Sequence, residues 1–336
     1  MRSRLTALLA AALVLGACSS STEEAPEPEQ SAAPSAAAST TDTPETAADT
    51  DFPRTIEVPA GRDLPATEVT LPAEPARVAA LTYETAELVA DLGAQERLVM
   101  VQEAMANPAI SDHAEAMAQI EQHAATEGSI DVEAVIAAQP DLVLLSDRRG
   151  LQEGLGQILG EAGIPVLVLP NNWATVADLA SNIELVGQAL GTDEEAAALS
   201  EQIVTGLGED TDPDGPRVLV LSNQAGQPFV TAGAAFPLEL VRLAGGQDAS
   251  EALGMARTGP ISAEQVIAAE PDAILLVDMN GTGEQIFEPL LSNAAVAELP
   301  AVAQERVLLV EGREVQALGF ADTVQARDRI AEWLAQ

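Results

Sequence analysis

The sequence contains few of the residues on which cofactor sites and nucleic-acid sites depend. Of its 336 residues, 2% are aromatic, one is Cys and two are His, and all 15 basic residues are Arg because Lys is absent. A single Cys cannot form an iron–sulfur cluster, a multi-Cys zinc site or a disulfide within the chain. So few rings cannot build many stacking platforms for bases or sugars. Any ligand site in this chain must therefore use few aromatic side chains.

Acidic residues greatly outnumber basic ones, with 53 Asp and Glu against 15 Arg and a formal net charge of −38. Phosphate backbones are bound by basic surfaces, so nucleic acid is not an expected partner. A surface of this charge is well solvated but identifies no function by itself. The length, with 47% apolar residues, is enough for two domains and a substantial core.

Residues 1–17 have the pattern of a bacterial export signal. Arg2 and Arg4 precede an apolar run, residues 5–15, that is too short to span a bilayer as a mature helix. Leu15-Gly16-Ala17-Cys18 resembles the lipobox of bacterial lipoproteins, in which the Cys becomes the lipidated first residue of the mature chain. This pattern predicts a protein anchored to the cell membrane through Cys18, on the extracytoplasmic face. The alternative is an ordinary signal peptide that is cut elsewhere.

Residues 18–51 differ in composition from everything that follows them. After Cys18 they are mainly Ser, Thr, Ala, Pro and acidic residues, with no aliphatic side chain larger than that of Ala. Such a segment cannot bury enough apolar surface to fold. We expect a disordered acidic tether that lets a folded body reach away from the membrane.

One pattern occurs twice, in residues 130–141 and 261–272. Both copies place a Glu three residues after an Ile, and a Pro-Asp pair follows seven residues after that Glu, before an apolar run. The pattern predicts a helix that is capped by Asp131 or Ser262, ends at the Pro, and leads into a buried parallel strand. An offset of 131 residues indicates duplicated lobes, since the repeats of a solenoid are far shorter.

The repeat predicts an α/β protein with two Rossmann-like lobes, residues 52–174 and 208–336. Both lobes begin in the same way, with a turn, an Arg and a strand, at Arg77 and Arg217. Apolar spacing over residues 175–207 predicts a long helical connector that is interrupted or bent near Gly191. Ligands of open parallel sheets bind beyond the carboxyl ends of the strands, so we expect a ligand cleft between the lobes.

No motif in the sequence indicates catalysis. It has no GxSxG elbow, P-loop or HExxH motif, so we do not expect an enzyme. Zinc and manganese ions are bound by clustered His and carboxylates, and with two His we expect no metal site of this kind. A tethered scaffold without a small ligand is the alternative from a different functional class.

The order of these parts resembles the substrate-binding proteins of bacterial ABC importers for iron–siderophores, haem and vitamin B12. The likeness covers approximately residues 52–336, and the paired Glu-then-Pro-Asp unit is its strongest element. Its other matching segments are residues 75–82, 87–88, 92–94, 128–145, 163–166 and 236–246. The resemblance implies a monomer with no intrinsic cofactor, a permease dimer as partner, and a metal chelate as ligand. A ferric siderophore is the first candidate, and haem or cobalamin are the alternatives.

Three arginines near the predicted cleft suit an anionic ligand. Arg148 and Arg149 directly follow a predicted strand, and Arg257 lies shortly before the second Glu-containing helix. Guanidinium groups bind oxyanions through paired hydrogen bonds, so these three are candidate ligand contacts. Alternatively, they pair with neighbouring acids such as Asp147.

Three aromatic residues complete the candidate ligand site. Tyr83, the only tyrosine, ends the first strand and could touch a chelate, ligate iron or pack at the rim of the core. Trp173 could form a flat apolar wall or pack at the hinge. Phe229 occupies the neighbourhood where haem binders of the family carry a Tyr, which favours a siderophore over haem. His113 and His123 could ligate haem or lie on the surface.

The resemblance also implies a docking role for one Glu in each copy of the repeat. In the family, paired Glu residues on the outer rim dock onto arginines of the permease, and the matching positions here are Glu133 and Glu264. A symmetric pair suits a permease dimer. The alternative is that each is an acid favoured in the first turn of its helix by the helix dipole.

Overall fold

A computed structural model describes residues 52–61, 64–124, 130–146, 154–170, 173–208, 212–316, 320 and 322–336. All of them belong to one structural unit of the chain, residues 48–336. The predicted export signal, the tether with Cys18, and the candidate ligand contacts Arg148 and Arg149 lie outside the described residues.

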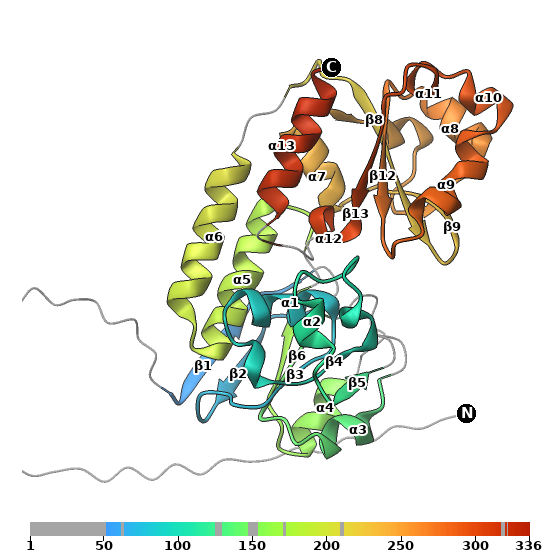
Figure 1. The fold of residues 1–336 in the computed structure, drawn as a ribbon. Coiled ribbons are helices and arrows are strands. Elements are labelled where there is room, and N and C mark those ends of the chain that lie inside the picture. Colours follow the sequence, from blue (N-terminus) through green and yellow to red (C-terminus); the bar gives the residue numbers. More distant parts are fainter. Residues whose placement is uncertain are drawn as a thin grey trace, which may run out of the picture. The chain divides into compact units, whose positions relative to one another are not determined.

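The N-terminal lobe is built on a parallel sheet with the strand order β5-β4-β3-β6-β7 (Figure 1). Its strands are β3 (Val78–Ala80), β4 (Leu98–Gln102), β5 (Gln122–Ala124), β6 (Leu142–Ser146) and β7 (Val166–Leu169). The central strands β3 and β6 are buried along their whole length. Burial on both faces explains why they appear in the sequence as unbroken apolar runs.

Short helices and one hairpin surround this sheet. The helices are α1 (Tyr83–Asp91), α2 (Ala114–Met117), α3 (Val132–Ala137) and α4 (Leu155–Glu161), with 3-10 turns at Gln95–Arg97 and Glu103–Ala106. The hairpin pairs β1 (Arg54–Val58) antiparallel with β2 (Thr67–Leu71). Alternate residues of β1 are buried, as expected for a strand with one face on a core.

The C-terminal lobe has a mixed sheet with the order β11-β9-β8-β12-β13, and β10 pairs with β8. Its strands are β8 (Arg217–Gln224), β9 (Gln227–Val230), β10 (Gln247–Asp248), β11 (Gly259–Pro260), β12 (Ala273–Asp278) and β13 (Val307–Glu311). β8, β10, β12 and β13 are parallel, whereas β9 is antiparallel to β8 and β11. The β8–β9 hairpin turns at Ala225 and Gly226, both with positive φ, which is the backbone that a two-residue hairpin turn requires.

Helices complete the C-terminal lobe. They are α7 (Phe236–Leu243), α8 (Ala263–Ala269), α9 (Gly283–Leu291), α10 (Ala294–Ala297), α11 (Pro300–Ala303), α12 (Gly312–Val315) and α13 (Thr323–Leu334), with a 3-10 turn at Ala249–Leu253. The two α/β lobes predicted from the sequence are therefore confirmed.

The duplicated sequence pattern folds as predicted, as α3–β6 in one lobe and α8–β12 in the other. Asp131 caps α3 by accepting hydrogen bonds from the backbone N–H groups of Glu133 and Ala134. Ser262 caps α8 by accepting from the backbone N–H of Gln265. These bonds satisfy donors that the first turn of a helix leaves without a partner.

The Pro-Asp pair also fastens each helix to the neighbouring strand. Asp141 accepts hydrogen bonds from the backbone N–H groups of Ala76 and Arg77 at 3.0 and 2.8 Å. Asp272 accepts one from the backbone N–H of Arg217 at 2.9 Å. The two arginines donate in return to the carbonyl groups at the ends of α3 and α8, both at 2.6 Å. The Arg and Asp residues that the sequence repeats separately thus form one clasp in each lobe.

The segment between the lobes forms two helices, α5 (Val176–Leu190) and α6 (Asp193–Leu207). The sequence left open whether the connector bends or breaks near Gly191, and in the structure α5 ends there. Gly191 has φ 72°, a conformation that favours glycine at a helix end. α5 and α6 lie side by side as a helical pair (Figure 1). One apolar core contains side chains of both lobes and of both connector helices.

Candidate functional site at the strand ends

The carboxyl ends of the N-terminal strands are linked by hydrogen bonds. The Ser146 backbone N–H, at the end of β6, donates to the Thr82 hydroxyl at 3.3 Å. The Trp173 indole N–H donates to the Ser146 Oγ at 2.9 Å. Trp173 is 9% exposed, and its ring centroid lies 6.1 Å from that of Phe320. The structure therefore places Trp173 in the packing that precedes α5, with little surface left for a ligand.

Tyr83 lies at the same edge, as the first residue of α1. It is half-buried and packs against the main apolar core. The preceding Thr82 forms a capping box with Thr85, which fixes the start of the helix. Tyr83 is thus positioned by backbone geometry at the edge where the sequence predicted it.

The strand ends of the C-terminal lobe carry a compact polar turn. Asp278, at the end of β12, accepts hydrogen bonds from the backbone N–H groups of Asn280, Gly281 and Thr282 at 2.9 to 3.1 Å. The Asn223 side chain, from β8, donates to the same carboxylate at 2.9 Å. Burial alone would raise the pKa of Asp278, but these hydrogen bonds to its charged form lower the pKa below the usual value. The turn is therefore held by a carboxylate that stays ionised.

Two further candidates lie on one margin of the C-terminal sheet. Phe229 is a half-buried residue of β9 and pairs with Pro260 of β11. Arg257 is exposed in the loop before β11 and packs its backbone against Gly233, where an added Cβ would lie 3.5 Å from the Arg257 Cα. The structure brings Phe229 and Arg257 to neighbouring places, since β11 follows Arg257 and pairs with β9.

The two lobes touch at a place that the sequence analysis missed. Arg313 of α12 forms an ion pair with Asp112, which lies in the loop before α2. The Arg313 guanidinium also pairs with Glu311 at 2.7 Å and with Asp322 at 3.1 Å. Arg313 follows the end of β13 just as Arg148 and Arg149 follow β6. Its position after a strand is therefore the sequence feature that could have marked Arg313 as a candidate.

Two carboxyl side chains and one imidazole, those of Glu87, Asp91 and His113, form a cluster beside this contact. Glu87 of α1 accepts hydrogen bonds from the Ser111 hydroxyl at 2.6 Å and from the Asp112 backbone N–H at 2.9 Å. Burial raises the pKa of Glu87 to about 8, against the Ser111 hydrogen bond and with the added effect of the Asp91 charge. The hydrogen bond that the His113 imidazole donates to Asp91, 2.7 Å long, raises the pKa of His113 against the effect of burial. Burial therefore makes Glu87 harder to ionise than an exposed glutamate.

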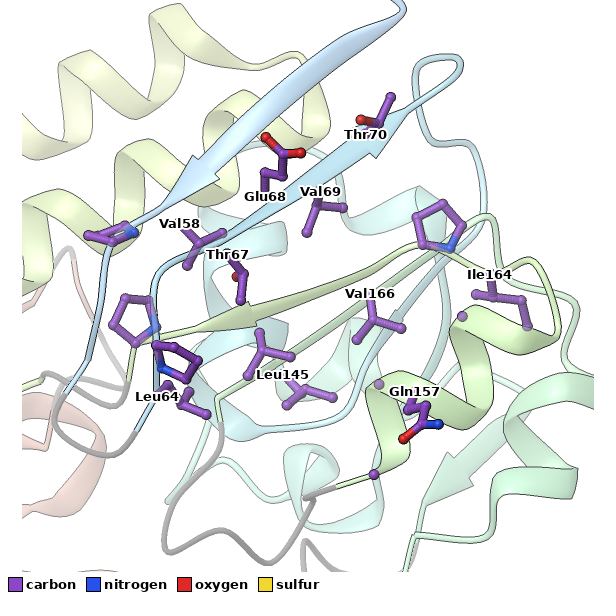
Figure 2. A pocket seen from close by; sticks show the side chains of 18 of the residues that line it. Val58, Leu64, Thr67, Glu68, Val69, Thr70, Leu145, Gln157, Ile164 and Val166 are labelled. Carbon is purple, nitrogen blue, oxygen red and sulfur yellow. The ribbon is translucent and has the colours of Figure 1, made fainter. Parts of the chain in front are cut away.

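A separate cavity of about 830 Å³ lies within the N-terminal lobe. It is formed between β2, β7 and α4, and Figure 2 shows its apolar side chains Val58, Val69, Leu145 and Val166. Its lining residues all come from the N-terminal lobe, so it is distinct from the contact between Asp112 and Arg313.

Among the described residues, no helix combines the length and the apolar character needed to cross a membrane.

Residues 78–313 match the family model for periplasmic binding proteins, so the chain belongs to this family of binding proteins.

Particular relatives add detail. The vitamin B12-binding protein of Yersinia pestis (strain Pestoides F) is 29% identical over 222 residues, which cover 65% of this chain and 74% of the relative. The periplasmic haem-binding protein RhuT from Roseiflexus sp. RS-1, in apo form, has a similar structure, with a TM-score of 0.64, 23% identity, and coverage of 77% of this chain and 97% of that one. A periplasmic haem-binding protein from Pseudomonas aeruginosa has a TM-score of 0.60 and 21% identity, covering 78% and 94%. These two structures share the fold.

Proposed function

We propose that this chain is the solute-binding component of an ABC importer, and that it captures a metal chelate between its lobes and delivers it to the permease. The observation that carries the proposal is the meeting of the lobes at Asp112 and Arg313, since α12 follows the end of β13 directly. Parallel sheets of this type bind ligands at the ends of their strands. Membership of the periplasmic binding protein family supports the same role.

A ferric siderophore is the first candidate for the cargo. Both histidines of the chain are engaged within the N-terminal lobe, His113 with Asp91 and His123 with the Met117 carbonyl at 3.2 Å. An axial bond from either imidazole to haem iron would have to replace one of these contacts within the N-terminal lobe. Siderophores offer a compact face of oxygen donors that Arg257, Arg148 and Arg149 would contact, with Tyr83 and Phe229 as the candidate aromatic contacts.

A tetrapyrrole is the second candidate. It is favoured by the ligands in the names of the relatives, vitamin B12 and haem.

Titration of the purified chain with separate chelates tests the cargo. Ferric catecholate, carboxylate and hydroxamate chelates, haem and cobalamin would each be added while the fluorescence of the two Trp residues is followed. We expect saturable quenching by one class of ferric chelate, weakened about tenfold or more by Arg257→Ala, if its charge-assisted hydrogen bond contributes about 1.5–3 kcal/mol. Saturable binding of haem or cobalamin alone would reassign the cargo. No saturable change with any chelate would contradict the proposed function and favour a scaffold.

Permease docking is assigned to Glu133 and Glu264. Both are exposed in the first turn of equivalent helices, α3 and α8, one in each lobe. Reversing both charges to Arg should abolish uptake and leave chelate affinity unchanged. Glu194→Arg with Glu195→Arg is the matched control, because these are also exposed first-turn acids, on α6. Uptake that survives reversal of Glu133 and Glu264 would contradict the assignment.

Membrane attachment is assigned to Cys18. A diacylated Cys gives the chain a strong anchor. Cys18→Ser should therefore move the protein from the membrane fraction to the soluble fraction. Full membrane retention of that variant would contradict the lipoprotein assignment.

A further inference from the structure

Helix α1 presents two carboxylates on one face beside a histidine from another segment. Glu87 and Asp91 are four residues apart, and this spacing places side chains on the same face of a helix. His113 comes from the loop that precedes α2. One ligand atom from each of the three lies within 4.8 Å of the other two. The sequence spacing gave no sign of this group, because the fold brings His113 to α1.

Asp91 has an oxygen that the rest of the described structure leaves unsatisfied. Its side chain is 10% exposed, and its Oδ1 lies 2.7 Å from the His113 Nε2. Its Oδ2 is buried and has no hydrogen-bond partner among the described residues. A buried carboxylate oxygen without a partner carries a desolvation penalty that protein groups or a bound cation normally offset. The other oxygen of the same carboxylate bonds to His113, so the unsatisfied oxygen is part of a side chain that already belongs to the cluster.

We propose that Glu87, Asp91 and His113 bind a divalent transition-metal ion. One imidazole with two carboxylates is a mixed nitrogen and oxygen set that suits zinc, cobalt, manganese or iron(II), whereas calcium and magnesium prefer oxygen ligands alone. Metal–ligand bonds of about 2.0–2.2 Å hold two ligand atoms at most about 4.4 Å apart. Side-chain shifts of a few tenths of an ångström would bring the three ligand atoms within that limit of one another.

The surroundings of the cluster fit a single divalent cation. The Ser111 hydroxyl and the Asp112 backbone N–H already hold the Glu87 carboxyl in place, as supporting hydrogen bonds do for metal ligands. The positive charge of Arg313 lies on the far side of Asp112, and Asp112, Glu311 and Asp322 all pair with its guanidinium. These three carboxylates offset the repulsion that the guanidinium would exert on a cation.

Binding of Co²⁺ to the full chain tests the proposal, because cobalt absorbs visible light when protein ligands coordinate it. After chelator treatment, we expect one Co²⁺ per chain with a visible band that Zn²⁺ displaces and a large excess of Ca²⁺ does not. His113→Gln and Asp91→Asn should each weaken Co²⁺ binding at least tenfold. His123→Gln is the matched control, since it removes the other histidine of the chain, and it should leave the band unchanged.

Several outcomes would overturn the proposal. They are the absence of a saturable visible band, equal binding by the chain with His113→Gln, and displacement by Ca²⁺, which would indicate adventitious binding to the acidic surface. Glu87→Gln serves as a second, nearly isosteric variant if His113→Gln does not fold, as judged by circular dichroism. Its amide oxygen can accept from the Asp112 backbone N–H while its NH2 group donates to the Ser111 hydroxyl, and it should also weaken binding at least tenfold. The test does not depend on the chelate cargo or on transport.

Discussion

The two lobes share the same clasp between helix and strand, but they differ in the first helix after the strand that opens the main sheet. This helix follows β3 directly in one lobe and comes after the β8–β9 hairpin in the other. In the N-terminal lobe that helix is α1, which buries the acidic side chains of Glu84 and Glu87. In the C-terminal lobe it is α7, which buries Phe236, Leu240 and Val241. The clasp between each Pro-Asp pair and its neighbouring strand is retained in both lobes. The repeated residues therefore maintain the backbone of both lobes. The buried acidic side chains beside the contact between the lobes belong to the N-terminal lobe.

The largest expected effect tests whether the lobes are one cooperative unit. Leu144 of β6 and Leu275 of β12 are equivalent, fully buried residues of the one apolar core that extends through both lobes. Leu144→Ala or Leu275→Ala should each lower the free energy of unfolding by about 2–5 kcal/mol. Because the core is shared, each substitution should shift a single transition in urea.

The two tryptophans provide a reporter for this measurement. Trp173 precedes α5 and Trp333 lies in α13, so Trp333→Phe and Trp173→Phe leave one reporter each. The transitions followed by the two reporters should coincide. If Leu275→Ala shifted only the transition seen by Trp333, the lobes would unfold independently.

The clasps are expected to differ in strength between the lobes. Asp141 accepts two backbone hydrogen bonds, whereas Asp272 accepts one from Arg217. Hydrogen bonds to charged groups contribute about 1.5–3 kcal/mol, and less where they are exposed. Asp141→Ala should therefore destabilise the protein by about 1–3 kcal/mol, and Asp272→Ala by less. Urea denaturation of both variants measures the difference, and equal losses would show that the clasps are equivalent.

The stability contributed by the polar contacts at the strand ends should depend on pH in the C-terminal lobe and not in the N-terminal lobe. The pKa of Asp278 is lowered in the folded protein, so its stabilisation is present above its ordinary value of 3.8 and is lost as the pH falls through the folded value. Asp278→Asn should lower the free energy of unfolding by about 1 kcal/mol at pH 7, the difference between hydrogen bonds to a charged and to a neutral acceptor, and by progressively less below pH 4.

Ser146→Ala is the comparison for that experiment. It removes the hydrogen bond from the Trp173 indole, which involves no titrating group, and should lower the free energy of unfolding by about 1 kcal/mol at every pH. Urea unfolding from pH 3.5 to 7 measures both variants. A loss at Asp278→Asn that did not vary with pH would contradict the ionised turn.

The smallest effect is expected at the ion pair that joins the lobes. Asp112 and Arg313 are both partly exposed, and Arg313 keeps Glu311 and Asp322 as partners when Asp112 is removed. A double-mutant cycle with Asp112→Ala and Arg313→Ala should give a coupling free energy below about 1 kcal/mol, decreasing as salt is added. A larger coupling, insensitive to salt, would make this pair and not the shared core the main connection between the lobes.

The sequence by itself determined the frame of this protein. The helix caps at Asp131 and Ser262, the stops at the two Pro-Asp pairs and the buried strands after them depend on local backbone preferences and on unbroken apolar runs. These local signals lie within a dozen consecutive residues, so their repetition can be recognised without a structure. An interruption or bend near Gly191 was likewise predictable, and the structure shows that α5 ends there, because glycine favours the left-handed backbone at a helix end.

Only the tertiary structure decided which side chains meet. Glu87 and Ser111, or Asp112 and Arg313, are separated by 24 and 201 residues, and no local pattern links them. In the C-terminal lobe, β9 pairs antiparallel with β8. This sheet is therefore mixed, whereas the sequence pattern predicted parallel strands. The sequence left open whether Trp173 forms a ligand wall or packs at the hinge, and in the fold its indole bonds to Ser146. Contacts of this kind depend on how whole elements pack, so burial, pKa values and the pairing of charges emerge only once the lobes are assembled.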